Sequence, residues 1–371
     1  MYEDIGLRYL SGNQQPDYWT LSEFRRRHHA ALGDLLVQTV CLAAKAGLVR
    51  LNHVALDGTK IKANASKHKA MSYGRMEKEE KRLREEIDRI LEKTNANDQA
   101  EDQEYGNQRG DDLPAELANR EKRLETIMKA KAELEAEARA KQEQEEAQRQ
   151  TKNDQEDDHT KSKDSKPQRS RKRKRKRKDA EPKDAKPKAK DQRNFTDPDS
   201  RIMRNSDKAF IQAYNAQASV DAETHIIVAA DLTNQAADTT HLPEQIEQVC
   251  RNLGRYPKEI STDAGYHSTK NLEILAENAI EAFILPDKVK HSEWREQKTI
   301  RGPIPRDASP TYLMRRKLTT KRGRNRYKLR QTSVEPVFGH IKEQLGLRQF
   351  LLRGLAKARP GSGLPVRSIT Y

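Results

Sequence analysis

The first 50 residues carry apolar side chains at intervals of three and four positions, which predicts a helical region over residues 1–50. The positions that follow this spacing are Leu32, Leu35, Leu36, Thr39, Val40 and Ala43. Gly47 is a suitable end for the last of these helices, because glycine is common just after a helix. The mostly apolar segment 52–61 that follows predicts a buried strand.

Residues 72–150 carry two narrow apolar stripes in sequence that is otherwise almost entirely Lys, Arg, Glu and Gln. The first stripe consists of Leu83, Ile87, Ile90 and Leu91, and the second of Leu117, Leu124, Ile127, Met128 and Leu134. This pattern is typical of two thin amphipathic helices, which we expect to pair as an antiparallel coiled coil across the polar gap at 95–112.

Residues 151–194 form a low-complexity stretch that contains the octad Arg171–Lys178, RKRKRKRK. Too few apolar side chains are present there to build a core, so we interpret the stretch as a disordered basic linker. The octad suits nonspecific DNA binding through counterion release, and it suits an uninvolved spacer equally well. It also resembles a nuclear localisation signal, although nothing else in the sequence points to a eukaryotic cell.

From Phe195 onwards the sequence predicts strands and helices in alternation. Apolar and polar residues alternate at 214–220, which is typical of a half-exposed strand, and residues 221–224 can turn the chain. The elements expected next are strands at 225–232, 258–263 and 281–285, and helices at 242–253 and at 270–279, the latter capped by Ser268 or Thr269. Residues 290–330 give no clear pattern. Pro336 is expected to start a final helix, which places Glu335 at or near its N-cap.

This order of elements predicts an α/β fold, in which a mixed sheet is flanked by helices and interrupted by a charged helical and disordered insertion. The expected divisions of the chain are a helical region at 1–50, the first strand of the core at 51–66, the insertion at 67–150, the linker at 151–194, the rest of the core at 195–355 and an irregular tail at 356–371.

Composition supports an extended or disordered component, because 34% of the residues are hydrophobic and 35% are charged. The net charge of +15 suits a polyanionic partner, but residues 161–190 alone contribute +12 of it. The remaining charge of about +3 is weak evidence that the folded part binds nucleic acid.

Cys41 and Cys250 lack the spacing of a zinc site or a disulfide framework, and no apolar run approaches the ~20 residues of a membrane span. We therefore expect a cytoplasmic protein without a membrane contact.

Three acidic residues stand at positions that a sheet would expose at its edge. Phosphodiester chemistry with two divalent cations requires carboxylates that meet on a rigid framework. Asp57 lies in an otherwise apolar strand, where its burial is costly unless it is paired or metal-bound, although a turn aspartate explains it as well. Asp263 ends a strand, where ligands of α/β sheets gather, and a turn or N-cap is its alternative. Glu335 at a helix N-terminus is explained by the helix dipole alone.

Basic and aromatic residues surround the last of these acids. Lys342 lies two helical turns after Glu335 and can meet a phosphate. Tyr327 and Arg330 belong to a basic stretch in which a guanidinium can hold a phosphate and a ring can stack on a base, and a solvated surface is the alternative for each. Asp238 and His241 allow a metal pair, but an N-cap before the helix at 242 is the simpler interpretation.

Taken together, three segments resemble the acidic motifs of bacterial insertion-sequence DDE transposases. They are VALDGTKIKANAS at 54–66, ISTDAGYHS at 260–268 and TSVEPVFGHIKEQLGLRQFLLRG at 332–354. The similarity is greatest to the branch with a helical insertion after the first aspartate, and it covers about residues 5–66 and 195–355. The three blocks in this order are far more specific than any one of them alone.

The resemblance implies an RNase H-like core in which Asp57, Asp263 and Glu335 bind two Mg²⁺ or Mn²⁺ ions. It implies an endonuclease step, in which water cleaves the ends of the element, followed by DNA recombination through attack of the freed 3′-OH on target DNA. The implied partners are the terminal inverted repeats, the target DNA and a second copy of the chain in a synaptic complex. The implied location is the nucleoid in the bacterial cytoplasm, and the helical region at 1–50 would bind DNA.

Tyr327, Arg330 and Lys342 resemble the DNA-binding residues of the family's tyrosine-arginine-glutamate-lysine motif. Four residues separate Arg330 from Glu335 where the family has three, whereas the spacing from Glu335 to Lys342 is the usual one.

Both ends of the chain depart from the family pattern. Residues 1–50 are shorter than the usual N-terminal region, and AKARPGSGLPVRSITY follows Gly354 in place of an apolar helix. A truncated or frameshifted copy has this pattern, so we hypothesise an impaired transposase. The alternatives are a DNA-binding remnant that does not cut, a metal-dependent nuclease without strand transfer, and a coiled-coil scaffold. A scaffold has no reason to place acids at strand ends in this order.

Overall fold

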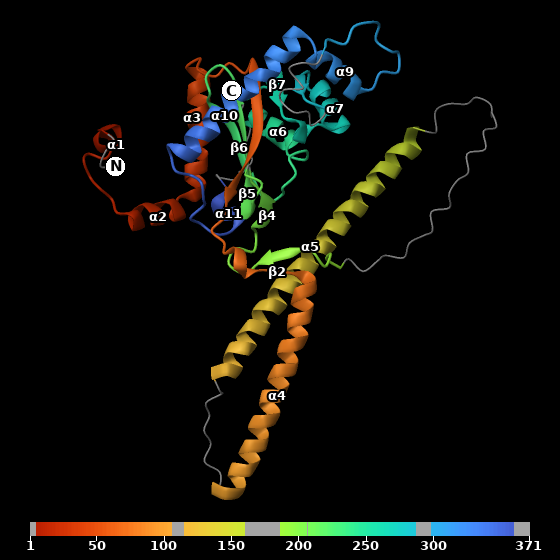
Figure 1. Ribbon diagram of the computed structural model, residues 1–371. Coiled ribbons are helices and arrows are strands. Elements are labelled where there is room, and N and C mark those ends of the chain that lie inside the picture. Colours follow the sequence, from red (N-terminus) through yellow and green to blue (C-terminus); the bar gives the residue numbers. More distant parts are fainter. Residues whose placement is uncertain (1–4, 106–114, 160–185, 206, 287–297, 360–371) are drawn as a thin grey trace, which may run out of the picture. The chain divides into compact units, whose positions relative to one another are not determined.

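The computed structural model describes residues 5–105, 115–159, 186–205, 207–286 and 298–359 (Figure 1). The chain folds as two compact units. The first unit comprises residues 1–65 and 199–371, and the second comprises residues 66–198. The octad Arg171–Lys178 lies outside the described residues.

The first unit is built on a six-stranded mixed sheet with the order β4-β5-β1-β7-β8, in which β6 also pairs with β5. The strands are β1 (His53–Lys62), β4 (Arg201–Arg204), β5 (Phe210–Asp221), β6 (Ile227–Thr233), β7 (Glu259–Thr262) and β8 (Glu281–Ile284). β1 pairs antiparallel with β5 and parallel with β7, and β7 pairs parallel with β8. The predicted α/β fold class with a mixed sheet is confirmed, and the arrangement is RNase H-like.

Helices cover both faces of this sheet. On one face, Val334 of α10 (Lys321–Glu343) packs with Ala55, Ala218 and Val220. On the other face, Leu242 and Ile246 of α6 (Leu242–Leu253) pack in a cluster with Leu56 and Ile260. Because successive residues of a strand point to opposite faces, Asp57 lies on the α10 side and Gly58 on the α6 side.

Further helices surround this framework. Ser268 caps α7 (Thr269–Glu277) by accepting a hydrogen bond from the Asn271 amide, as the sequence predicted. α9 (Pro310–Leu318) contributes Met314 and Leu318 to the core. The N-terminal region forms α1 (Ile5–Leu10), α2 (Tyr18–Arg27) and α3 (His29–Lys45), and α3 contacts α6.

α10 differs from the prediction, because it begins at Lys321 and Pro336 lies inside it. Glu335 is therefore a mid-helix residue and not an N-cap. Residues 321–334 carry too few apolar side chains to reveal a helix by their spacing. Proline cannot donate a hydrogen bond to the preceding turn, yet the helix continues because the flanking Val334 and Val337 pack on the sheet.

Ion pairs hold the N-terminal half of α10. Arg322 lies within ion-pair distance of Glu259 and Glu281, at 3.2 Å and 2.6 Å, and Arg326 lies 3.0 Å from Glu259. Glu259 and Glu281 are the first residues of β7 and β8. These ion pairs, together with the buried ring of Tyr327, fix where this half of the helix crosses the sheet.

The second unit consists of two long helices and a small sheet. α4 (Tyr73–Tyr105) and α5 (Ala115–His159) pair through the cluster of Met76, Leu83, Ile127 and Leu134 and their neighbours. Tyr73 contacts Glu135, Glu80 contacts Lys131 and Glu86 contacts Arg120, so the partners on α5 fall in number as those on α4 rise. The two helices are therefore antiparallel, as predicted, while a supercoil stays a prediction.

The structure differs from the predicted linker at both of its ends. α5 extends to His159, because its Glu, Gln, Lys and Arg residues are strong helix formers that need no core. β3 (Gln192–Asn194) pairs with β2 (Ala70–Ser72). Arg193 is buried there in ion pairs with two glutamates of α5, Glu133 and Glu137.

The tail also begins with structure that the sequence did not predict. α11 (Leu355–Ala358) starts where the Leu355 amide donates a 2.8 Å hydrogen bond to Asp199. Arg359 then pairs with Asp231 of β6. None of the helices in the described part of the chain has the length and apolar composition of a membrane span.

A glycine contact between α9 and α10 provides a test of this fold. A Cβ at Gly323 would lie 2.1 Å from the carbonyl oxygen of Lys317, which is backbone that cannot easily yield. Gly323→Ala should therefore lower the free energy of unfolding by about 1–3 kcal/mol, measured by urea denaturation followed by circular dichroism.

Gly339 on the same helix is the matched control, because a Cβ there meets no atom within 4 Å. Gly339→Ala should raise the free energy of unfolding by about 0.5–1 kcal/mol through helix propensity. Equal stability of the two variants would contradict the close approach of α9 and α10.

Candidate active site

Two of the predicted acids lie side by side because their strands are parallel neighbours. β1 and β7 pair in a register that places Leu56 opposite Thr262. Asp57 follows Leu56 within β1, and Asp263 directly follows the last residue of β7. Asp263 is the N-cap of the short 3-10 helix Ala264–Tyr266, and its carboxylate accepts a 2.9 Å hydrogen bond from the Gly265 amide.

Arg330 connects the first acid to the third. Its guanidinium donates a 2.7 Å hydrogen bond to Asp57, which is 273 residues away in sequence. A second nitrogen of the same guanidinium lies 3.4 Å from the Glu335 carboxylate. Asp57 and Arg330 are largely buried, with side chains 18% and 14% exposed, whereas Glu335 is 50% exposed. Glu335 is therefore the most solvent-accessible of these three side chains.

The electrostatics of this cluster disfavour its negative charge. Burial raises the pKa of the Asp57 carboxyl to about 6, the Arg330 guanidinium opposes this rise, and the nearby carboxylates of Asp263 and Glu335 add to it. Asp57 therefore interacts with both Asp263 and Glu335, and one arginine does not compensate for its burial beside them. A carboxyl with a pKa this far from its usual value is typical of functional sites.

Lys342 and Tyr327 lie on the same helix on either side of Arg330. Lys342 donates a hydrogen bond to Thr59, two residues after Asp57 and on the same face of β1. Tyr327 is buried in the core, only 6% exposed, with Arg330 5.9 Å from its ring centroid. Its ring supports Arg330 and is not exposed for stacking on a base, because the apolar cluster that includes Leu56 and Leu318 encloses it.

A fourth acid, Asp238, lies beside this site. Asp238 and His241 were expected to supply an N-cap before the helix at 242. His241 occupies the N-cap of α6, and no side chain caps that helix end. The Asp238 carboxylate instead accepts hydrogen bonds from Lys60, Asn215 and Gln217. The sequence carried no direct signal for this role, because Asn215 and Gln217 lie on the polar face of β5, which was expected to be exposed and is buried instead.

A divalent cation fits the chemistry of these donors. Hard cations such as Mg²⁺ prefer carboxylate oxygens, and a cation would offset the burial and the repulsion between carboxylates that raise the pKa of Asp57. Within the ranges that the structure describes, no three acidic, His or Cys side chains already stand in a metal-ligand arrangement. Arg330 instead bridges two of the acids.

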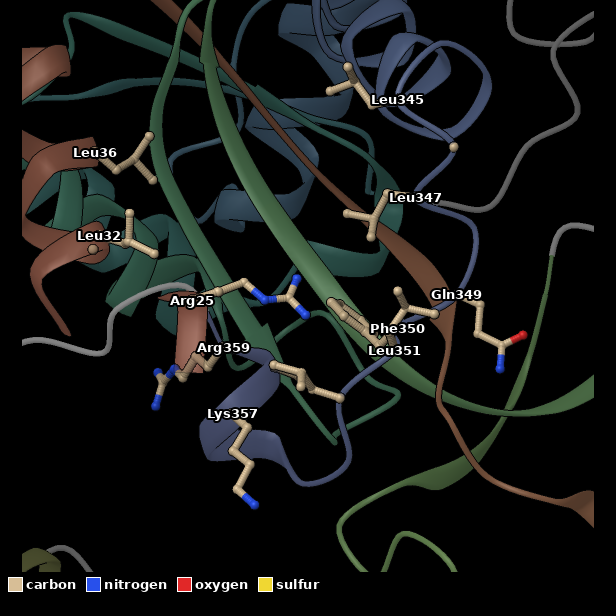
Figure 2. A pocket seen from close by; sticks show the side chains of 14 residues that line it. Arg25, Leu32, Leu36, Leu345, Leu347, Gln349, Phe350, Leu351, Lys357 and Arg359 are labelled. Atoms are coloured by element: carbon tan, nitrogen blue, oxygen red, sulfur yellow. The ribbon is translucent and has the colours of Figure 1, made fainter. Parts of the chain in front are cut away.

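A cavity of about 460 Å³ lies elsewhere in the first unit (Figure 2). Its wall is mostly apolar, with Leu32 and Leu36 of α3 on one side and Leu345, Leu347 and Phe350 on the other. Basic side chains at its rim include Arg25 and Lys357. None of the three acids lines it, so it is separate from the candidate site.

Comparison with known proteins places residues 164–359, just over half of the chain, in a match to the family described as the transposase DDE domain. The matched segment includes Asp263 and Glu335, while Asp57 precedes it. No curated protein and no solved structure gives a significant match.

The pKa of Asp57 predicts how stability depends on pH when metal ions are removed with EDTA. An aspartate in the unfolded chain ionises near pH 3.8, whereas folded Asp57 keeps its proton to about pH 6. Between these values the folded state binds more protons, so the free energy of unfolding falls as pH rises, by about 1–3 kcal/mol in total.

Asp57→Asn removes this titration. From pH 4 to pH 7 the free energy of unfolding of the natural protein should therefore fall relative to that of Asp57→Asn. Urea denaturation at several pH values measures this change. The Arg330 ion pair exists only while Asp57 is ionised, so its contribution is already included in the pKa of about 6 and adds no separate slope. A constant difference across this range would contradict the raised pKa.

Proposed function

Because this chain belongs to the transposase DDE domain family, we propose that it cuts DNA at the ends of an insertion sequence and joins those ends to target DNA. The observation that carries the proposal is the contact of Arg330 with both Asp57 and Glu335, beside the strand that leads to Asp263. It supports a single site assembled from three carboxylates that are far apart in sequence. Such a site suits phosphodiester cleavage and transfer with divalent cations.

The family generally uses divalent metal ions, and in this chain Asp57, Asp263 and Glu335 would hold two Mg²⁺ or Mn²⁺ ions. When bound, the ions supply Lewis acidity for the attacking and leaving oxygens. The chain itself provides ionised ligands, since a pKa of about 6 leaves Asp57 mostly charged at neutral pH. The parallel pairing of β1 with β7 keeps the two aspartates in register.

Two cations of α10 are proposed to hold the DNA backbone beside the carboxylates. Arg330 presents a planar guanidinium that can bind a phosphate bidentately once a metal ion neutralises the acids. Lys342 lies near Thr59 on the same face of the sheet. Tyr327 supports Arg330 from the core side. In this proposal Tyr327 contributes to DNA binding by orienting Arg330 and not by direct stacking.

The N-terminal helices are proposed to recognise the terminal inverted repeats. α2 ends in Arg25, Arg26 and Arg27, and it has no buried residues among those that the structure describes. Synapsis of two element ends requires two recognition surfaces, so a homodimer is the expected assembly on DNA. These partners follow from the proposed reaction.

One observation favours an alternative, a protein that binds DNA without cutting it. Arg330 lies between Asp57 and Glu335 and pairs with both of these carboxylates, which would hold the metal ions. If the guanidinium did not yield, the carboxylates would stay closed to metal ions. The test below separates the two functions, and it also separates a transposase from a nuclease that cleaves without strand transfer.

The decisive assay incubates the purified chain with DNA that carries the ends of its own element, with Mg²⁺, with Mn²⁺ and with EDTA. We expect nicked and joined products with either metal ion and none with EDTA, resolved on denaturing gels. Nicks without joined products would indicate a nuclease. Binding without nicks would indicate the DNA-binding alternative.

Substitution of the three acids tests their roles separately. Asp57→Asn, Asp263→Asn and Glu335→Gln should each reduce cleavage by at least about 100-fold, because each removes a negatively charged ligand. Binding of the same DNA, measured by gel shift, should be retained. Glu244→Gln is the control, because Glu244 is an exposed acid on α6 that pairs with Arg251. Normal cleavage by any of the three site variants would refute the assignment of that residue.

A further inference from the structure

We infer that Asp238 is a positioning residue that fixes the segment carrying Asp263 against the strand carrying Asp57. The inference rests on the proposed function, since it concerns how the ligands of that site are held. Asp238 lies in the connection between β6 and α6. It contacts neither Arg330 nor Glu335 in any described hydrogen bond, so its effect on the site has to pass through its neighbours.

Three donors converge on one oxygen of the Asp238 carboxylate. Oδ1 accepts hydrogen bonds from Lys60 Nζ at 3.2 Å, Asn215 Nδ2 at 2.7 Å and Gln217 Nε2 at 2.9 Å. Asn215 and Gln217 are buried. Without the carboxylate, two buried amides and an ammonium would lose their shared acceptor, which is costly for groups withdrawn from water. Asp238 therefore fixes the orientation of both amides.

The first connection of this network leads to the strand of Asp57. Gly58 follows Asp57 and points to the opposite face of the sheet. A Cβ at Gly58 would lie 2.5 Å from Gln217 Nε2 and 2.9 Å from Asp238 Oδ1. Only a residue without a side chain lets the network pack directly against the β1 backbone at this point. Lys60, on the same face, ties the strand to the carboxylate a second time.

The second connection leads to the turn that begins with Asp263. The oriented Gln217 accepts a hydrogen bond from the hydroxyl of Tyr266, which is fully buried. Burial, together with the charges of Asp238, Asp57 and Asp263, holds the pKa of Tyr266 well above its usual value, so the hydroxyl stays a donor.

Thr239, the neighbour of Asp238, reinforces this second connection. Its hydroxyl donates a 2.7 Å hydrogen bond to the carbonyl oxygen of Gly265. Asn271 donates to the carbonyl oxygens of both Thr239 and Tyr266, at 2.8 Å and 2.7 Å. Residues 238 and 239 thus hold the turn 263–266 at two points. The Gly265 amide in this turn donates to the Asp263 carboxylate, so the position of that carboxylate depends on the network.

Two readouts test this role apart from turnover. One is the affinity of the DNA-free protein for Mn²⁺, measured by electron paramagnetic resonance. The other is hydrogen exchange of the Gly265 amide in the metal-free protein, measured by NMR. Asp238→Ala should lower the Mn²⁺ affinity roughly 10-fold or more, as expected for residues that orient ligands, and should accelerate the exchange.

Two conservative variants sharpen the test. Asp238→Asn keeps an oxygen for Asn215 and Gln217 and loses only the charge toward Lys60, so it should restore much of both readouts. Tyr266→Phe removes only the hydroxyl that binds Gln217, so it should shift both readouts in the same direction as Asp238→Ala but less.

Asp221→Asn is the control for a general loss of stability. Asp221 is a buried carboxylate at the far end of β5, and it accepts hydrogen bonds from the Arg50, Leu51, Glu223 and Thr224 amides. Its substitution should lower the melting temperature and leave the Mn²⁺ affinity unchanged. An equal loss of Mn²⁺ affinity in this control would overturn the positioning role.

The positioning role would also be overturned if Asp238→Ala bound Mn²⁺ as tightly as the natural protein and its Gly265 amide exchanged at the same rate. If Asp238→Ala did not fold, the same result in Tyr266→Phe would decide the question. If the natural protein bound no Mn²⁺, the proposed function would fail. Exchange of the Gly265 amide in the metal-free proteins would then decide the positioning role. Faster exchange in Asp238→Ala than in the natural protein would support that role, and equal exchange would refute it.

Discussion

The ion pair between Asp57 and Arg330 is the interaction on which the rest of the site depends. A carboxylate in the central strand of a sheet needs a compensating charge, and α10 supplies it from the far end of the sequence. Once Arg330 is placed, the helix geometry brings Glu335 and Lys342 to the same region. The other half of α10 is held by Arg322 and Arg326 at the starts of β7 and β8.

The sheet separates two kinds of chemistry. Asp57 and Thr59 point toward α10, where the cations Arg330 and Lys342 lie. Gly58 and Lys60 point to the other face, where Asp238 gathers a polar network. The alternation of a single strand therefore places ligand groups on one side and their support on the other. The turn after Asp263 is held from the Asp238 side of the sheet by two hydrogen bonds, one from Tyr266 to Gln217 and one from Thr239 to Gly265.

The long insertion leaves this sheet intact because each unit has its own core. The apolar side chains of α4 and α5 are buried against each other, and those of the sheet are buried under α3, α6, α9 and α10. β1 and β5 accordingly pair over nine consecutive positions, from Val54 with Asp221 to Lys62 with Ala213, across the inserted sequence. A polar insertion of this kind adds chain between paired strands without removing apolar surface from their core.

The sequence by itself determined most of the framework and singled out the three candidate acids. β1, β5, β7, β8, α6 and α7 follow from local alternation, helical spacing and the Ser268 cap, because each depends on residues that are neighbours in the chain. The position of Asp57 in an apolar strand marked it as a candidate without any knowledge of its partners.

Tertiary structure alone decided where α10 begins, what surrounds Glu335 and what Asp238 does. The first half of α10 is held by ion pairs and by the single buried ring of Tyr327, and these contacts leave no apolar period in the sequence. Tyr327 was expected to be available to DNA, yet it belongs to the core because α9 and the sheet enclose it. Asp238 had the local pattern of an N-cap, and only the approach of β1 and β5 gave its carboxylate three other donors. Local pattern reports what a residue can do with its neighbours, whereas the partners of a buried charge are set by contacts between residues distant in sequence.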